Sequence, residues 1–243
     1  MERGWASSPL STATEKRRRS IENLLFIWNS LPPLLKGTVV TLELTFLLLA
    51  LGLVAGIPLA LGQVYGGRGV VLLSSTYERF FRSIPALVLL FLFFFGSSFF
   101  GLSISAFVSA VLALGFRSSA YQSQIFRGAI QSIPQGQMIA ARSLGMSKFR
   151  AIRHIVLPQA LRLSLPPWSN EFSSVIKDTS LAYAVGVIEL VREGRYIIVR
   201  TFEPMIIYIT IAIIYFVLTY AGNRSLGYLE DKLKIPGLET KGR

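Results

Sequence analysis

The side chains best suited to bind a polar solute stand inside long apolar segments of the chain. They are Glu43, Gln124, Asn170, Glu171 and Asp178. A carboxylate at membrane depth costs about 2.5–3.5 kcal/mol on insertion scales, so such groups should face protein or water rather than lipid. These residues could therefore line a route for a solute, and Glu171, which follows a double proline, is the first choice. The alternative for each is a hydrogen bond between helices, or, for Glu43, contact with lipid headgroups.

The residues that most catalytic and metal sites require are scarce. The chain has no cysteine, and His154 is its only histidine. Thiolate sites are thereby excluded, and neither a histidine metal cluster nor a Ser-His-Asp triad is expected. No Gly-x-x-x-x-Gly-Lys-Ser/Thr phosphate loop occurs in the sequence. We expect a chain that is not an enzyme and holds no cofactor or metal. If ATP drives it, another polypeptide must hydrolyse the ATP.

The composition is that of an integral membrane protein with one membrane domain. Of the 243 residues, 52% are hydrophobic, and the mean hydropathy is +0.53. Several apolar runs approach the ~20 residues that cross a bilayer as a helix. The net charge of +12 would suggest nucleic-acid binding in a soluble protein. Here the basic residues stand between apolar runs, as the positive-inside rule describes, so we expect a lipid bilayer and no nucleic acid. No removable signal peptide is recognised.

The apolar pattern predicts about five transmembrane helices. A polar tail over 1–20, with a basic run at 16–19, precedes an interfacial helix over 21–31, and Pro32-Pro33 is expected to break the chain there. Small residues of the first span, including Gly52 and Gly56, suit close helix packing. The predicted spans cover 34–62, 84–100, 104–126, 157–178 and 204–222, with a helical stretch over 70–83 and a short re-entrant or outer-surface segment over 181–190. The domains are thus 1–33, 34–222 and a basic tail over 223–243.

The distribution of Lys and Arg predicts the orientation of the chain. The segments 63–83, 124–162 and 222–243 hold three, six and five basic residues, whereas 97–103 and 177–202 hold none and four. The basic-rich segments should lie in the cytoplasm, with the N-terminus outside and the C-terminus inside. The basic run at 16–19 argues for the opposite orientation. The three segments that are richer in Lys and Arg together carry more weight, so we keep the N-terminus outside.

A short basic stretch between the third and fourth spans has the character of a docking element. It reads IAARSLGMSKFRAIRHIVLP over 139–158. Its small residues leave room for another protein to approach the backbone, and Leu144, Phe149 and Ile152 fall broadly on one helical face. Pro134 is a plausible start for the helix, since proline is tolerated in the first turn. We expect this stretch on the cytoplasmic side, against a soluble partner.

The same stretch resembles the cytoplasmic loop of ABC importer permeases, in which E-A-A is followed by three residues, Gly, nine residues, Ile, one residue and Leu-Pro. The matching positions are Ala140, Ala141, Gly145, Ile155, Leu157 and Pro158, with Leu144 beside them; Ile139 replaces the Glu. Segments 81–88, 119–137, 170–172 and 177–181 resemble motifs of the polar amino-acid branch of this family. They depart from these motifs at Ser83, Ile84 and Gln124, where the family usually has Gly, Thr and an acid.

The resemblance implies an all-α integral membrane protein of the type I ABC importer permease class, with a cytoplasmic coupling loop over about 134–158. It implies two permease subunits around the pathway, identical or paralogous, and a pair of ATPase subunits that bind ATP and Mg²⁺. It also implies an extracytoplasmic solute-binding protein, a polar amino acid as substrate, and the cell membrane of a prokaryote. The alternative is an ion-gradient-coupled amino-acid carrier that uses Glu43 and Glu171. Such carriers often show inverted repeats, and none is evident here.

Overall fold

The structure, a computed structural model, describes residues 9–234, and all regular elements in that range are helices. The predicted termini at 1–8 and 235–243 lie outside the described residues. In chain order, the helices are α1 (Pro9–Tyr65), α2 (Arg68–Ser83), α3 (Ala86–Phe99), α4 (Ala106–Ser132), α5 (Gln135–Ser143), α6 (Lys148–Ala151), the π-helical turn η1 (Ile152–Val156), α7 (Leu157–Leu163), α8 (Leu165–Asp178), the 3₁₀ turn η2 (Thr179–Val185), α9 (Leu190–Thr201) and α10 (Pro204–Leu233).

The first helix is longer than the sequence predicts. Residues 9–20, expected as a polar tail, are helical, and α1 continues through Pro32 and Pro33, where a break was expected. Proline has a helix-compatible φ, so its cost here is two missing backbone donors. Packing beyond this point offsets that cost. Leu34 is fully buried with Leu190 of α9, and a Cβ on Gly37 would lie 2.8 Å from the Leu190 Cα.

Small residues bring α1 and α4 into close contact, as the sequence predicts. Gly52 and Gly56 of α1 face Gln122 and Ser119 of α4 so closely that a Cβ on either glycine would lie within 3.1 Å of the neighbouring helix. Without side chains at these positions, polar groups on α4 reach the backbone of α1. This helix pair forms the centre of the fold.

The predicted helical stretch over 70–83 and the second predicted span over 84–100 are two helices with a sharp bend between them. α2 and α3 meet at an angle of 103° across Ile84 and Pro85, both in extended conformations. Proline disfavours the helical region for the residue before it, so the chain turns here instead of continuing as one helix. With 14 residues, α3 is about 21 Å long, shorter than the ~30 Å hydrocarbon core. The helix expected over 84–100 is therefore present as α3, but α3 is too short to cross the hydrocarbon core by itself.

The interruption of the fourth predicted span is confirmed. α7 ends at Leu163, Ser164 forms a turn, and α8 begins with Pro166 and Pro167 in its first turn. Both prolines stand where an unpaired N–H would occur in any helix, so they start α8 without disrupting it. After α8, the η2 turn ends at Gly186, whose φ of 105° requires glycine.

Two of the described helices are long and apolar enough to cross a membrane without interruption. They are the Ile21–Tyr65 part of α1 and α10, and the bent α2–α3 pair brings the number to three at most. The third and fourth predicted spans are helical, but α4 carries a buried polar face and α7–α8 is broken. α10 also extends to Leu233, beyond the predicted boundary at 222.

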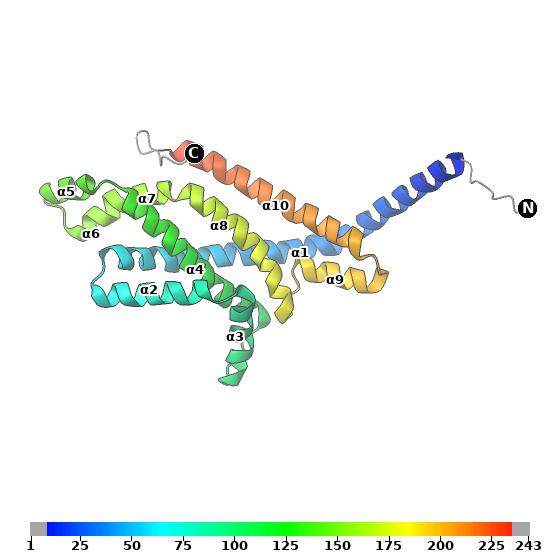
Figure 1. Cartoon of the computed structure of the whole chain (residues 1–243), viewed down its shortest axis with the longest axis horizontal. Helices are drawn as coiled ribbons and strands as arrows, with labels where there is room; N and C mark the ends of the chain where they lie inside the picture. The colour runs from blue at the N-terminus through cyan, green and yellow to red at the C-terminus, as the bar shows by residue number, and fades with distance from the viewer. Residues whose placement is uncertain (1–8, 235–243) are drawn as a thin grey trace, which may run out of the picture.

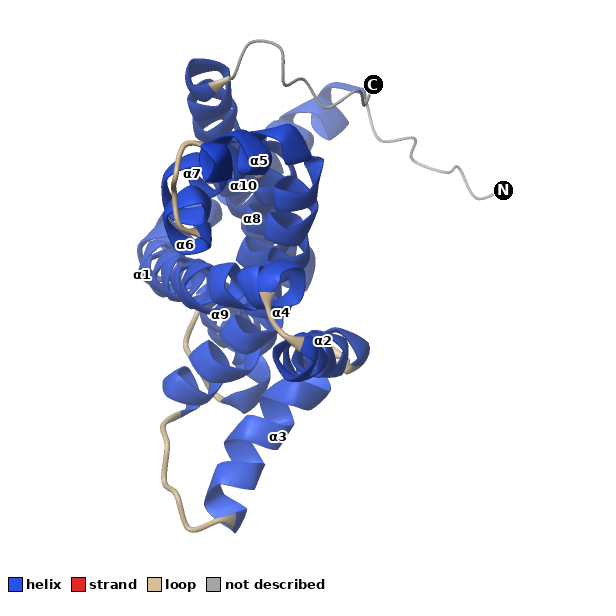
Figure 2. Ribbon diagram, turned by 90° about the vertical axis from the view of Figure 1, so that its left-hand side faces the viewer, coloured by secondary structure: helices blue, strands red, loops and turns tan. Residues whose placement is uncertain are grey.

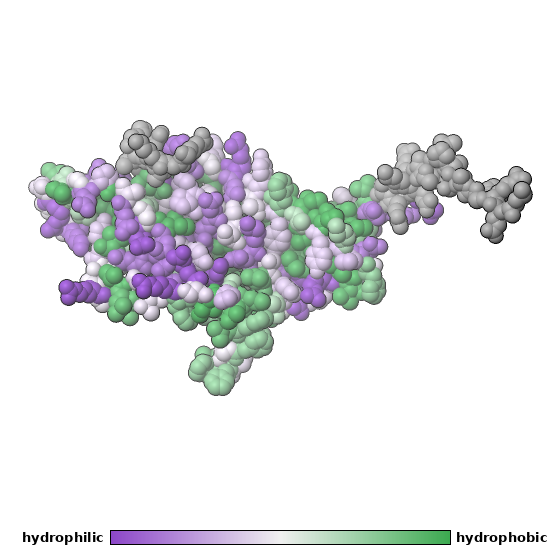
Figure 3. Space-filling view, viewed as in Figure 1, coloured by the Kyte–Doolittle hydropathy of each residue, from purple (hydrophilic) through white to green (hydrophobic). Residues whose placement is uncertain are grey.

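The helices form an elongated bundle with two distinct ends. The α5–α6 region lies at one end together with the turn between α1 and α2, and the start of α1 projects from the other end beyond α9 (Figure 1). Seen from the α5–α6 end, α3 extends away from the bundle to one side (Figure 2). Hydrophilic residues gather over the half that holds α2 and α5–α8, whereas hydrophobic residues cover α3 and the region of α9 (Figure 3).

Candidate functional site

The predicted docking stretch forms two short helices and a turn. α5 follows Pro134, as predicted, and ends in a Schellman motif: the N–H of Gly145 donates to the Arg142 carbonyl (3.0 Å) and that of Met146 to the Ala141 carbonyl (3.1 Å). Gly145 has a φ of 81°, a conformation that favours glycine. Ser147 then caps α6 by accepting a hydrogen bond from the Arg150 N–H. The expected single helical face through Leu144, Phe149 and Ile152 is therefore wrong, because the helix ends at Ser143.

The exposed side of this region is apolar and basic. Ile139, Leu144 and Phe149 are 64%, 84% and 69% exposed, although they belong to three successive elements. The same stretch also exposes the cations Arg142, Lys148, Arg150 and Arg153. Exposed large apolar side chains that gather at one place mark an interaction site. We call the surface formed by these seven residues the coupling surface.

The remaining predicted coupling residues divide between this surface and the interior. Ala140, Gly145 and Pro158 are exposed, Ile155 and Leu157 are half-buried, and Ala141 is buried. A Cβ on Gly145 would meet no atom within 4 Å, so a partner has free access to this point of the backbone. Ala141 instead packs inward and anchors α5.

The coupling surface rests on the ends of the long helices. Lys148 donates a hydrogen bond from Nζ to the Tyr65 carbonyl at the end of α1 (3.1 Å) and lies over the ring of Tyr65. Val156 of η1 packs with Phe126 and Ile130 of α4 in one buried cluster. The coupling region is thus in direct contact with both α1 and α4.

A second polar region lies between α4 and α8. Arg117 and Asp178 form an ion pair of 2.6 Å, and Ser118 donates a hydrogen bond to Glu171 Oε1 (2.7 Å). The guanidinium group of Arg117 also lies 4.8 Å from the ring centre of Tyr121. An arginine in an apolar span requires such partners, because an isolated charge there is costly.

A buried glutamine extends this region to α1. Gln122 donates to the Leu49 carbonyl (3.3 Å) and to Ser118 Oγ (3.1 Å), and its Oε1 accepts a hydrogen bond from the Trp168 indole (2.9 Å). Gln122 is fully buried, so these bonds satisfy both ends of its amide. We call Arg117, Ser118, Gln122, Trp168, Glu171 and Asp178 the polar cluster.

The five predicted pathway residues do not all meet. Glu171 and Asp178 lie in the polar cluster. Gln124, which lies on α4 as Arg117 does, donates a hydrogen bond to Gln63 Oε1 of α1 (3.1 Å). Asn170 is exposed on α8, and Glu43 is exposed on α1 beside Leu42 and Phe46. Arg117, Ser118, Gln122 and Trp168 were not among the predicted pathway residues. The signal that could have found them is Arg117, a cation in an apolar span that needs an acid nearby.

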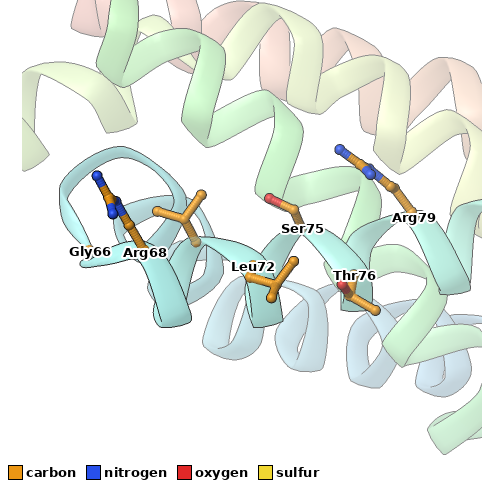
Figure 4. A pocket seen from close by; sticks show the side chains of 7 residues that line it. Gly66, Arg68, Leu72, Ser75, Thr76 and Arg79 are labelled. Atoms are coloured by element: carbon orange, nitrogen blue, oxygen red, sulfur yellow. The ribbon is translucent and has the colours of Figure 1, made fainter.

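A pocket along α2 is separate from the polar cluster. It is lined by Arg68 and Arg79, three helical turns apart, with Leu72, Ser75 and Thr76 between them (Figure 4). Over residues 9–234 no group of acids, histidines and cysteines is arranged to hold a metal ion.

Comparison with known proteins identifies the family. Residues 52–235 match the family described as "Binding-protein-dependent transport system inner membrane component". The chain belongs to this family. It is a membrane-embedded permease subunit of an ABC importer, so the alternative of an ion-gradient-coupled carrier is wrong, and the expected type I permease fold is confirmed.

Individual relatives are similar over most of their length. The permease is 36% identical over 211 residues to the glutamine transport system permease protein of Escherichia coli, covering 86% of this chain and 96% of that one. It is 37% identical over 212 residues to the nopaline transport system permease protein of Agrobacterium fabrum, covering 83% and 88%. A solved amino acid ABC transporter with histidines is 36% identical, with a TM-score of 0.79 over 86% of this chain and 97% of that one.

Proposed function

We propose that this permease carries polar amino acids and is driven by a separate ATPase that docks on the coupling surface. The observation that carries the proposal is the exposure of Ile139, Leu144 and Phe149 in one stretch with four exposed cations, at one end of a membrane protein. Such a surface favours a soluble partner, since large apolar side chains outside the bilayer are stabilised by contact with protein.

The substrate class follows from the polar cluster and from the relatives. A zwitterionic amino acid presents an ammonium and a carboxylate group. Glu171 and Arg117 offer groups of both charges on facing helices. The names of two relatives mention glutamine and histidine, both polar amino acids. We infer that Glu171 contacts the substrate and that Arg117 and Asp178 position the substrate.

The other partners and the orientation complete the proposal. Two permease subunits would enclose the pathway, a pair of ATPases would bind ATP and Mg²⁺, and an extracytoplasmic binding protein would deliver the solute. The coupling surface and the C-terminus would face the cytoplasm of a prokaryotic cell, with the N-terminus outside. ATP binding shifts the permease between two arrangements if the ATPases bind one of them more tightly. No step requires chemistry on this chain.

Substitutions on the coupling surface test the proposal. We expect Leu144→Ser and Phe149→Ser to reduce co-purification of the ATPase by about tenfold or more, since central apolar residues of an interface contribute about 2 kcal/mol or more. Tyr228→Ser is the matched control, because Tyr228 is 70% exposed near the end of α10 and lies outside the coupling surface. Full retention of the ATPase by both coupling variants would contradict the assignment.

Transport by the reconstituted complex tests the energy source and the substrate class. We expect uptake of a polar amino acid into vesicles. This uptake should require ATP on the side of the membrane where the ATPase lies, and it should persist when ion gradients are collapsed. Uptake that follows an ion gradient without ATP would contradict the proposal.

A further inference from the structure

Helices α8 and α10 form a groove in the half of the bundle that holds α9. The two helices lie in contact along their length (Figure 1), and Ser173 of α8 donates a hydrogen bond to Asn223 Oδ1 of α10 (2.8 Å). Nearer the C-terminal end of α8, the groove between them has a volume of about 520 Å³. Ligand pockets commonly measure about 300–1,000 Å³ and are mostly apolar, with a few polar groups that orient the ligand. The groove thus has the size of a small-molecule site.

The floor of this groove is apolar and is held in place from behind. The apolar lining residues are Val191 of α9 and Ile211, Ala212 and Phe216 of α10. Tyr215, which also lines the groove, donates its hydroxyl hydrogen to Glu189 Oε2 (3.3 Å), and Glu189 caps α9. The floor can therefore contact the hydrocarbon part of a ligand, whereas a charged group of that ligand needs a partner elsewhere in the groove.

The charged side chain that lines the groove is Lys177 of α8. Lys177 is exposed and forms no ion pair with an acid in residues 9–234. The acids nearby are engaged, since Asp178 pairs with Arg117 and Glu189 accepts two backbone hydrogen bonds at the start of α9. An ionisable residue within a membrane span pairs with another group or marks the path of a solute. The anionic partner of Lys177 must therefore come from outside the described chain.

The exposed face of α8 favours a polar solute over lipid as this partner. Asn170, Ser174 and Lys177 are all exposed, and their spacing of i, i+4 and i+7 places them on one helical face. A helix that faces lipid exposes apolar side chains instead, as α10 does at Ile213 and Val217. Polar groups on a membrane span face protein or a water-filled cavity. The face of α8 that ends at Lys177 is thus suited to the path of a polar solute.

We propose that Lys177 binds the carboxylate group of an amino acid that enters the permease, while the groove floor contacts the hydrocarbon part of the amino acid's side chain. The ammonium group of lysine has three N–H donors, and its hydrogen bonds to a carboxylate are strengthened by charge. Every amino acid carries this carboxylate, whereas the side chains differ. Lys177 would therefore recognise the class of substrate and not the individual member.

This inference rests on the proposed amino-acid function and adds a second contact to it. Lys177 lies six residues beyond Glu171 on α8, which is about 9 Å along the helix axis. The groove lies in the half of the bundle away from the coupling surface (Figure 1). A solute that enters from that half would meet Lys177 before Glu171.

Binding of an amino acid and of its amide tests the role of Lys177. The probes are L-glutamine and L-histidine and their α-amides, in which a neutral carboxamide replaces the α-carboxylate. Equilibrium dialysis measures their binding to the permease–ATPase complex in detergent, without the binding protein, whose own selectivity would otherwise contribute. We expect the natural complex to bind the amino acid about tenfold or more tightly than the amide, since a hydrogen bond to a charged group is stronger than one to a neutral group.

Three substitutions and a matched control separate charge from structure. Lys177→Met should weaken binding of the amino acid about tenfold and leave binding of the amide unchanged. Lys177→Arg keeps the positive charge and should keep the preference for the carboxylate. Ala212→Trp fills the groove without removing Lys177, so it should weaken binding of both probes. In the control, Lys232→Met, the replaced lysine is exposed near the end of α10 and lies outside the groove, so the preference should stay as in the natural complex.

Two outcomes would overturn the role of Lys177. A Lys177→Met complex that still prefers the amino acid over its amide would show that another group binds the carboxylate. Equal losses for both probes in Lys177→Met and Lys177→Arg would show that the residue is structural. Uptake of the same amino acids by the complete natural transporter is measured in parallel. Absent uptake would overturn the proposed function and this inference with it, whereas normal uptake with either of the two outcomes would overturn the role of Lys177 alone.

Discussion

Substitution of Gly52 by alanine should break the contact between α1 and α4. A Cβ at this position would lie 1.9 Å from Nε2 and 2.7 Å from Cδ of Gln122, well inside van der Waals contact. Gln122 is fully buried and holds hydrogen bonds to Leu49, Ser118 and Trp168. It cannot swing away without losing some of them. The clash is thus converted into lost hydrogen bonds between α1, α4 and α8.

The expected loss of stability follows from these terms. Overpacking of a well-packed interior costs about 1–3 kcal/mol, and each lost hydrogen bond about 1 kcal/mol. Alanine regains about 1 kcal/mol over glycine in a helix. The net change in the free energy of unfolding is then about −2 kcal/mol, which corresponds to a fall in Tm of about 4–8 °C for a chain of this length. Heating the detergent-purified permease, followed by size-exclusion chromatography, measures this shift.

A control and a double substitution decide whether Gln122 is the cause. A Cβ on Gly128 of α4 would meet no atom within 4 Å, so Gly128→Ala should leave Tm equal or higher. Gln122→Ala removes the atoms that the new methyl group would meet. In that background, Gly52→Ala should cost much less than in the natural chain, because the two residues are coupled. An equal cost in both backgrounds would refute the proposed clash.

Three further substitutions test the coupling region, the polar cluster and the α9 cap. Gly145→Val should lower ATP-driven uptake, because a φ of 81° strains L-residues by about 1–2 kcal/mol, whereas Gly145→Asn should retain most uptake. Equal uptake by the two variants would argue against a conformational role for Gly145. Glu171→Gln keeps an acceptor for Ser118 but removes the charge, so it should weaken substrate affinity with little change in Tm; an unchanged substrate profile would make Glu171 structural. Glu189 is fully buried and accepts from the N–H groups of Val191 and Arg192, both at 2.9 Å. Glu189→Ala should therefore lower the free energy of unfolding by about 1–3 kcal/mol, measured by the same heating assay, and a Tm within error of the natural chain would contradict this.

Features governed by neighbours in the sequence were predictable. Pro134 starts α5, the prolines at 166 and 167 interrupt the fourth span, and the glycines of α1 pack closely on α4. In each case the signal is local: a missing donor or a missing side chain. The coupling stretch was likewise predicted from the spacing of its residues, whereas its division into α5 and α6 was not.

Features that depend on distant partners were not predictable. Pro32-Pro33 alone indicates a break, and only the packing of Leu34 against α9 explains why α1 continues. The polar cluster joins Arg117 to Asp178 across 61 positions of sequence. A single sequence shows that Arg117 needs an acid but does not say which one. The bend between α2 and α3 is similar, since Pro85 indicates an interruption without giving its angle of 103°.

The coupling surface and the polar cluster are joined by one continuous set of contacts. Val156, next to the coupling surface, lies in the buried cluster against which Trp168 packs. The indole of Trp168 donates to Gln122, Gln122 donates to Ser118, and Ser118 donates to Glu171. Interiors packed this closely transmit displacement instead of absorbing it. A shift of η1 that moves Trp168 must therefore strain or rearrange the bonds of Gln122, and these bonds fix the hydroxyl group that holds Glu171. An ATPase that displaces the coupling surface would thereby alter the position of the carboxylate that we assign to the substrate.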